Sequence, residues 1–350
     1  MDPDGDLVLQ VGSRFGSPRE FRVCSATMRR TSPVWKNMLF GVWKEAKPTA
    51  GPWVVDLPED KPEPVHGLLA IIHSKFHLVH SSYRIPRLSQ LHDILVVTDK
   101  YDMISVIQPW ARTWVQQVRI PVDSVFGTPQ SDGHDCILRI HVAWELGIDD
   151  LLSTDISELI FNSTITTCQA TKPLRLPFEQ KVVYKGQVLQ FDSNAGPSDI
   201  VETIAEHRSS LIQTLLDFYH AEVKCRTRDE GECRATAGAV VYSGGIKYSE
   251  RQLCDSLILG SLFRTQQRLG YSSLPLEASK YFNDANFLMG TLSSIFTALP
   301  YLSDRHRGCP PSKKYVEFEV RTKADPRWLN VLGPEHKQRM EAQRKILGLP

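Results

Sequence analysis

The start of the chain most constrains its fold, because two short strands and two helix starts follow one another there. Residues 7–11 are apolar enough for a buried strand, and residues 20–24 alternate between polar and apolar side chains. Residues 12–17, rich in glycine and serine, predict a turn that joins these strands in a hairpin. Ser25 and Ser32-Pro33 then predict helix starts, because serine caps helices and proline is tolerated in a first turn. These features predict a small sheet covered by short helices.

The spacing of apolar residues along the rest of the chain predicts mainly helices. A third strand is expected at 53–57, and a hairpin within 181–191 is expected to turn at Lys185-Gly186. Residues 226–245 are polar and contain glycines, so a loop is expected there. Further helices are predicted at 64–74, 88–103, 106–118, 136–146, 147–162, 198–223, 249–270, 283–298 and 334–347. The predicted fold class is therefore α+β, with a small sheet followed by a mainly helical extension.

A change in composition predicts where the chain divides. Residues 121–134 are rich in Pro, Gly, Ser and Asp, as linkers between folded parts often are. We therefore expect a first domain at 4–119 and a helical extension at 134–300. Residues 311–350 are expected to form a charged and less ordered tail. Two domains suit a chain of 350 residues.

Charge and motif content argue against several classes of function. The chain has 41 Lys and Arg against 40 Asp and Glu, so it offers no global attraction for nucleic acid or acidic membrane. The acidic start of the chain does not resemble a signal peptide, and no apolar run is long enough to span a membrane. A cytoplasmic or nuclear location is expected. Nucleophile-elbow and phosphate-loop motifs are also missing, so we expect no enzyme activity.

The seven cysteines are scattered, and no two have the C-x-x-C spacing. An odd and sparse set predicts reduced, buried thiols and no disulfide framework, and we expect no cofactor and no metal. One alternative stays open. His220, Cys225, Cys233 and Cys254 have the ligand types of a structural zinc site, although their spacing is irregular.

The predicted N-terminal elements also carry a family resemblance. The segments Asp6–Val11, Phe21–Ser25, Ser32–Leu39 and Val54–Leu57 together resemble the BTB/POZ domain, a small sheet with helical hairpins. Cys24 stands where that family usually has histidine. The segments that resemble the fungal branch of the family are His66–His73, Leu91–Met103, Pro109–Trp114, Ala143–Gly147 and, more loosely, Cys254–Leu262.

The resemblance implies a protein-interaction module or adaptor, because BTB domains pair with themselves or with other proteins. In the family the first strand and first helix form much of the dimer face, which here implies Leu7, Leu9 and Met28. Trp43-Lys44-Glu45 resembles the segment with which some members recruit a cullin scaffold of ubiquitin ligases. Trp43 would fill a pocket and Glu45 would lie at the rim. An uncharacterised enzyme within the extension is a third alternative.

Overall fold

The computed structural model describes residues 1–79, 86–119, 133–167, 180–189, 199–228, 231–233, 240–243 and 246–350. The chain divides into two compact units. The N-terminal unit comprises residues 1–155, 190–199 and 332–350, and the C-terminal unit comprises residues 156–189 and 200–331. This division differs from the predicted domains, since the last residues of the chain join the N-terminal unit. Most of the predicted linker, 121–134, lies outside the described residues.

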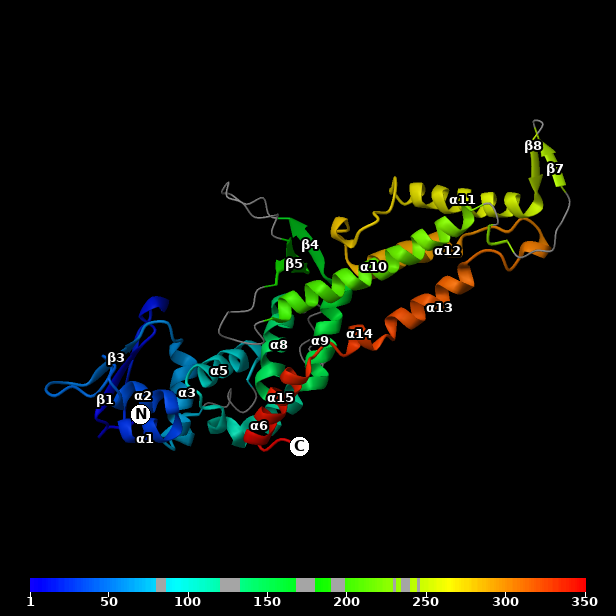
Figure 1. The fold of residues 1–350 in the computed structure, drawn as a ribbon. Helices are drawn as coiled ribbons and strands as arrows, with labels where there is room; N and C mark the ends of the chain where they lie inside the picture. Colours follow the sequence, from blue (N-terminus) through cyan, green and yellow to red (C-terminus); the bar gives the residue numbers. More distant parts are fainter. Residues whose placement is uncertain are drawn as a thin grey trace. The chain divides into compact units, whose positions relative to one another are not determined.

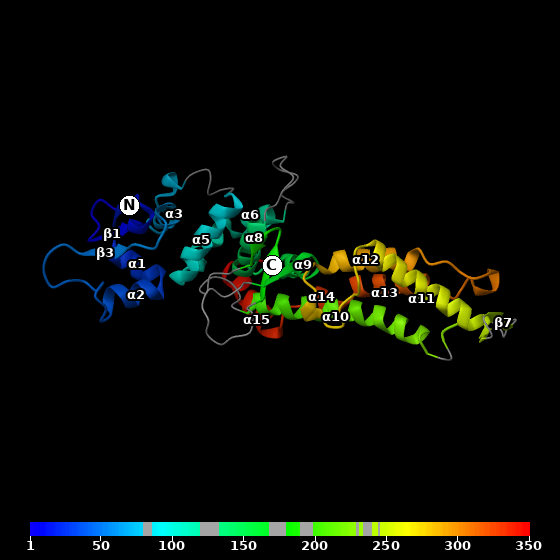
Figure 2. The same ribbon diagram turned by 90° about the horizontal axis from the view of Figure 1, so that it is seen from above.

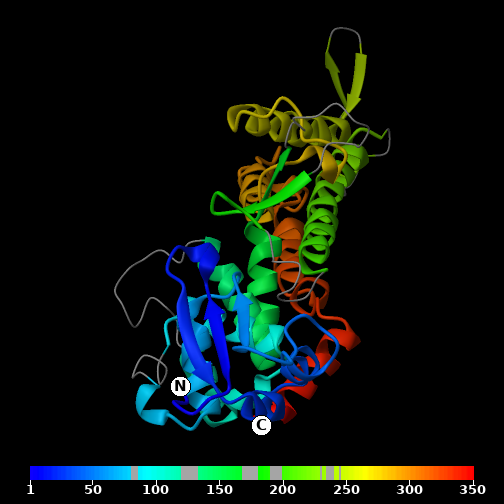
Figure 3. The same ribbon diagram turned by 90° about the vertical axis from the view of Figure 1, so that its left-hand side faces the viewer.

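The sheet of the N-terminal unit has three strands in the order β2-β1-β3 (Figure 3). β1 (Leu7–Val11) is antiparallel to β2 (Arg19–Val23) and parallel to β3 (Val54–Leu57). A parallel partner requires a crossover connection, which α1 (Ser25–Thr31) and α2 (Pro33–Phe40) supply. The sheet therefore contains the three predicted strands, and every second residue of β1 is buried.

Local capping explains where the first helices begin. Ser32 caps α2 as predicted, since its hydroxyl accepts a 3.0 Å hydrogen bond from the backbone N–H of Trp35. The prediction that Ser25 caps α1 is wrong, and Cys24 precedes the helix instead. Both the hydroxyl and the backbone N–H of Ser25 donate to the carboxylate of Asp6, at 2.8 and 2.9 Å. The Ser25 hydroxyl is thus engaged outside the helix.

The remaining helices of this unit cover the sheet or follow it in sequence. They are α3 (Pro62–Ile72), α5 (Leu88–Lys100), α6 (Gln108–Val118), α8 (Gly133–Leu146), the first part of α9 (Asp149–Asn162) and α15 (Pro334–Ile346). The predicted helix at 334–347 is confirmed as α15. The expectation of a less ordered tail is wrong, because α15 packs on α8 and buries Met340. The apolar contacts of α15 lie far away in sequence, which local composition does not reveal.

Gly147 ends α8 in a conformation that only glycine adopts freely, with φ of +69°. A Cβ atom at this position would lie 2.5 Å from the backbone oxygen of Met340. We expect Gly147→Ala to destabilise the protein by about 2–5 kcal/mol, through backbone strain and overlap. Gly186 also has a positive φ, but a Cβ there meets open space, so Gly186→Ala should cost only about 1–2 kcal/mol. If denaturant titrations show that Gly147→Ala and Gly186→Ala lose the same free energy of unfolding, this prediction is contradicted.

The C-terminal unit is built on long helices. α10 (Ile200–Arg226), α11 (Glu250–Arg268) and α12 (Ala285–Thr297) pack against one another, and α13 (Ser312–Lys323) packs on α12 (Figures 1 and 2). α14 (Pro326–Leu329) follows and buries Trp328. Apolar side chains fill the space between the helices, and the fully buried ones include Leu211, Leu215, Ile258, Leu262, Leu292 and Phe296.

Two small sheets complete this unit. β4 (Thr164–Thr167), β5 (Gln180–Tyr184) and β6 (Gln187–Val188) form one sheet, and β5 and β6 turn at Lys185-Gly186 as predicted. β7 (Val240–Ser243) and β8 (Ile246–Ser249) form the other. The expectation of a loop throughout 226–245 is therefore wrong, since β7 lies within it. The α+β class is confirmed in the sense of many helices with small sheets. Among the described residues, no helix has the length and apolar character to cross a membrane.

Candidate functional site

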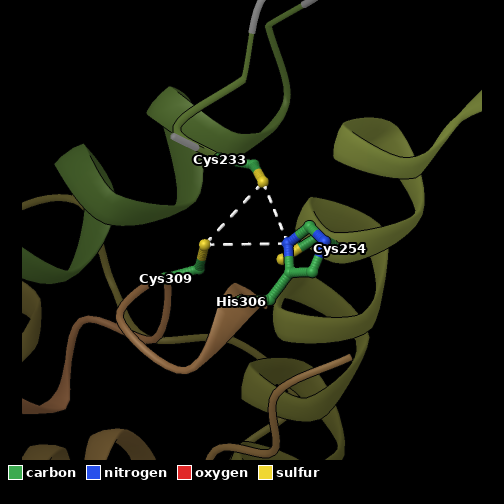
Figure 4. A group of neighbouring side chains, drawn as sticks. All are labelled: Cys233, Cys254, His306 and Cys309. Carbon is green, nitrogen blue, oxygen red and sulfur yellow. Dashed lines mark hydrogen bonds between the residues drawn. The ribbon is translucent and has the colours of Figure 1, made fainter. Parts of the chain in front are cut away.

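Three cysteines and a histidine converge in the C-terminal unit (Figure 4). Cys233 lies between α10 and β7, Cys254 lies near the start of α11, and His306 ends the short 3-10 helix Asp304–His306. Cys309 follows three residues later. The four potential ligand atoms lie within 4.8 Å of one another. We call these four residues the Cys/His cluster.

The distances within the cluster are short and similar. The Sγ atom of Cys233 lies 3.2 Å from Nδ1 of His306 and 3.7 Å from Sγ of Cys309. The Sγ atom of Cys309 lies 3.8 Å from the same Nδ1. His306 therefore turns its Nδ1 toward the sulfurs (Figure 4). A disulfide bond has an S–S length of about 2.05 Å, so Cys233 and Cys309 are not joined by one.

The Cys/His cluster is shielded from water. Cys254 and His306 are fully buried and Cys233 is nearly so, whereas Cys309 is partly accessible. Burial raises the pKa of the Cys254 thiol, and the neighbouring Cys309 and Cys233 raise it further.

A buried ion pair connects the segments that carry the cluster. Arg226, at the end of α10, donates one hydrogen bond of 2.8 Å to Asp255 Oδ1 and another of 2.8 Å to the backbone oxygen of Cys309. The other carboxylate oxygen of Asp255 accepts the backbone N–H groups of Glu232 and Cys233. Asp255 is adjacent to Cys254, so these contacts fix the backbone beside three of the four cluster residues.

The far side of the His306 ring faces a carboxylate. Glu250 Oε1 lies 3.3 Å from Nε2 of His306, an ion-pair distance without the alignment of a hydrogen bond. Glu250 lies in the first turn of α11, one turn before Cys254. The Glu250 carboxylate and the sulfur atoms therefore lie at opposite nitrogens of the His306 ring.

The sequence identified half of this cluster. Cys233 and Cys254 belong to it, but His220 and Cys225 do not, which corrects the open zinc alternative. Nε2 of His220 instead lies 2.9 Å from the backbone oxygen of Pro275. His306 and Cys309 were missed. Their H-x-x-C spacing was a signal, because two ligands three residues apart can bind one ion.

The predicted cullin-binding residues lie in the connection between α2 and β3. Trp43 is 63% exposed and its neighbour Val42 is 99% exposed. Glu45 is less accessible, and its carboxylate lies 3.6 Å from the Nζ atom of Lys44. Its backbone oxygen accepts a hydrogen bond from the indole N–H of Trp53. Trp43 therefore exposes most of its apolar side chain to water. The backbone of the nearby Glu45 is fixed by its hydrogen bond with Trp53.

The predicted dimer face needs correction. Leu7, Leu9 and Met28 are all completely buried within the N-terminal unit. Leu7 and Leu9 are two residues apart on β1, so they share the face of the sheet that the unit's own helices cover. These three side chains belong to the core of this unit and have no exposed surface of their own for a second copy to contact.

A buried carboxyl group lies where α8 meets α15. Burial raises the pKa of Glu145 to about 7, against the opposing effect of Arg339, while Asp99 raises it further. Arg339 donates a 3.0 Å hydrogen bond to this carboxylate. Glu145 binds its proton more tightly in the folded state than in the unfolded state. Its contribution to the free energy of unfolding is therefore greatest below about pH 4.5, and this contribution is lost as pH rises toward about 7.

We therefore expect Glu145→Gln to change the pH dependence of stability. Between about pH 4.5 and pH 7 the wild-type protein should lose on the order of 3 kcal/mol relative to the variant. Urea titrations at several pH values measure this difference. Glu341→Gln on the exposed side of α15 is the control and should follow the wild type. If the free energies of unfolding of the wild type and Glu145→Gln change with pH in parallel, the expected proton uptake by Glu145 on folding is contradicted.

Comparisons with protein-family models, curated proteins and solved structures found no match to this chain.

Proposed function

We propose that the protein is a protein-interaction adaptor whose N-terminal unit is a BTB/POZ-type domain. The order of its elements supports this proposal, because strand, strand, helix pair and strand follow one another as the family resemblance implies. The parallel pairing of β1 with β3 through the crossover of α1 and α2 is a second support. The proposed activity is recognition through buried contact area, without bond chemistry.

The observation that carries the proposal is the exposed apolar segment Phe40–Trp43. Phe40 ends α2, and Val42 and Trp43 lie beyond it with most of their surface exposed to water. Phe40 contacts the Arg29 guanidinium, 4.8 Å from its ring centre, and makes a T-shaped ring contact with Trp53. Aromatic residues commonly anchor protein interfaces. The side chains of the Phe40–Trp43 segment would therefore insert into an apolar pocket on a different protein.

Affinity capture from the native cell with the full chain as bait tests this proposal. We expect Trp43→Ala to weaken capture of a specific partner about 30-fold, which corresponds to a hot spot of about 2 kcal/mol. Phe15→Ala is the matched control, since Phe15 is a similarly exposed aromatic in another connection of the same unit. Unchanged recovery with Trp43→Ala would contradict this assignment of the contact.

A cullin-type ubiquitin-ligase scaffold is a second candidate, and the position of Glu45 favours it. Glu45 follows Trp43 closely and is fixed through its backbone contact with Trp53. If the partner is a cullin scaffold, Glu45→Lys should lower its recovery, because a reversed rim charge slows association and disfavours the partner. Absence of any cullin among the captured proteins would remove this candidate and leave the more general adaptor role.

Self-association is a separate outcome of the same proposal. Since Leu7, Leu9 and Met28 are buried, any pairing of two copies must use other residues. Light scattering of the purified chain at increasing concentration distinguishes the cases. A constant monomer mass supports association with a different protein, whereas a dimer mass that Trp43→Ala lowers indicates pairing through the Phe40–Trp43 segment.

A further inference from the structure

We propose that Cys233, Cys254, His306 and Cys309 bind one Zn²⁺ ion, which holds three segments of the C-terminal unit together. The proposal concerns a different unit from the adaptor proposal and does not depend on it. It begins from the convergence of four soft donor atoms in a buried place, drawn from positions far apart in the sequence (Figure 4). Three thiol groups and one imidazole form a ligand set typical of structural zinc.

The separations between donors suit tetrahedral coordination. Zinc–sulfur bonds of about 2.3 Å and zinc–nitrogen bonds of about 2.0 Å place two sulfurs about 3.8 Å apart, and sulfur and nitrogen about 3.5 Å apart. The sulfur atoms of Cys233 and Cys309 are 3.7 Å apart. Nδ1 of His306 is 3.2 and 3.8 Å from them. The three donors thus have the spacing of neighbouring corners of such a tetrahedron.

The surroundings have the features of a second coordination layer. Zinc-bound histidine usually faces a carboxylate with its other nitrogen, and here Glu250 faces Nε2 of His306. Asp255 accepts the backbone N–H of Cys233, and Arg226 donates to the backbone oxygen of Cys309. Both contacts fix ligand positions without using the sulfur atoms.

The number of protein ligands indicates what the ion does. Catalytic zinc sites keep one position for water or substrate, whereas structural sites have four protein ligands. All four positions are filled here by side chains, and two of them are completely buried. The ion therefore connects the segment after α10, the first turns of α11 and the segment around His306. We assign it a structural role.

Metal analysis of the full chain, purified without chelators, tests the stoichiometry. We expect one zinc per chain in the wild type. The zinc should survive dialysis against a weak chelator, whereas Cys233→Ser, Cys309→Ser and His306→Ala should lose it. His306→Cys should keep it, because four cysteines are also a ligand set of structural zinc. Cys225→Ser is the matched control, and it should retain zinc since Cys225 lies outside the cluster.

Zinc-edge X-ray absorption of the wild type tests the ligands without any variant, so misfolding cannot obscure the result. Three sulfurs and one nitrogen are expected in the first shell. Glu250→Gln should then lower zinc affinity about 10-fold in competition with a chelator, as loss of a second-layer partner usually does. Oxygen-rich coordination, iron or copper in place of zinc, a disulfide found by mass spectrometry, or zinc retained in all the ligand variants would overturn the proposal.

Discussion

Removal of zinc by a strong chelator is expected to destabilise the C-terminal unit by about 5 kcal/mol or more. Structural zinc contributes on the order of 10 kcal/mol of apparent binding free energy in small domains. Whole domains are stable by only about 5–15 kcal/mol, so this loss is large. Two of the ligands, Cys233 and Cys309, lie outside helices and strands, so no helix or strand hydrogen-bond pattern holds them in place.

Hydrogen exchange with mass spectrometry localises this effect. Peptides that contain Cys233, the start of α11 or His306 should exchange faster after zinc removal. Peptides from β1 and α2 should be unchanged and serve as an internal control. Added Zn²⁺ should restore protection, but Mg²⁺ should not, since it prefers oxygen ligands. Equal protection with and without zinc would show that the ion is not structural.

Replacement of Arg226 has the second-largest expected effect. Its side chain is only 3% exposed and pairs with Asp255, and Glu222 lies 3.9 Å away. Arg226→Met would leave buried carboxylate charge without its partner, which typically costs about 3–5 kcal/mol. Chemical denaturation measures this loss, and we expect zinc affinity to fall with it.

Two further variants separate charge from packing in this test. Arg226→Met combined with Asp255→Asn should recover part of the stability, because the unpaired charge is then removed. Lys323→Met breaks a half-exposed pair with Glu319 on α13 and should cost less than about 1 kcal/mol. A loss for Arg226→Met as small as that for Lys323→Met would show that the buried pair contributes little.

The elements that local chemistry defines were predictable. Ser249 caps α11 and pairs reciprocally with Gln252, which makes the helix start visible in the sequence. The apolar character of residues 7–11 predicted the buried strand β1, although not what covers it. The error over Leu7, Leu9 and Met28 arose because a family pattern cannot say whether an apolar face meets a partner or the chain's own helices. Ser198, the first residue of the helix predicted at 198–223, lies outside the described residues.

The Cys/His cluster was predictable only in part. The ligand types of His220 and Cys225 suggested that they belong to the cluster, but their positions on α10 place them outside it. Successive helical residues point about 100° apart, so Cys225 cannot face the same point as Arg226, which contacts the cluster backbone. His306 and Cys309 are brought in by the path of the chain after α12. Such long-range convergence depends on packing that no local pattern encodes.

The assignment of residues 332–350 to the N-terminal unit has a consequence for how the protein comes apart. The chain leaves that unit after Asp155, returns to it at residues 190–199 and joins it again from Leu332 onward. If the C-terminal unit unfolds while residues 190–199 and α15 stay docked, residues 200–331 form a closed loop with both ends held. Such a loop gains less chain entropy than a dangling end, which opposes the melting. A protease cut within it would leave two fragments that stay associated until α15 is released.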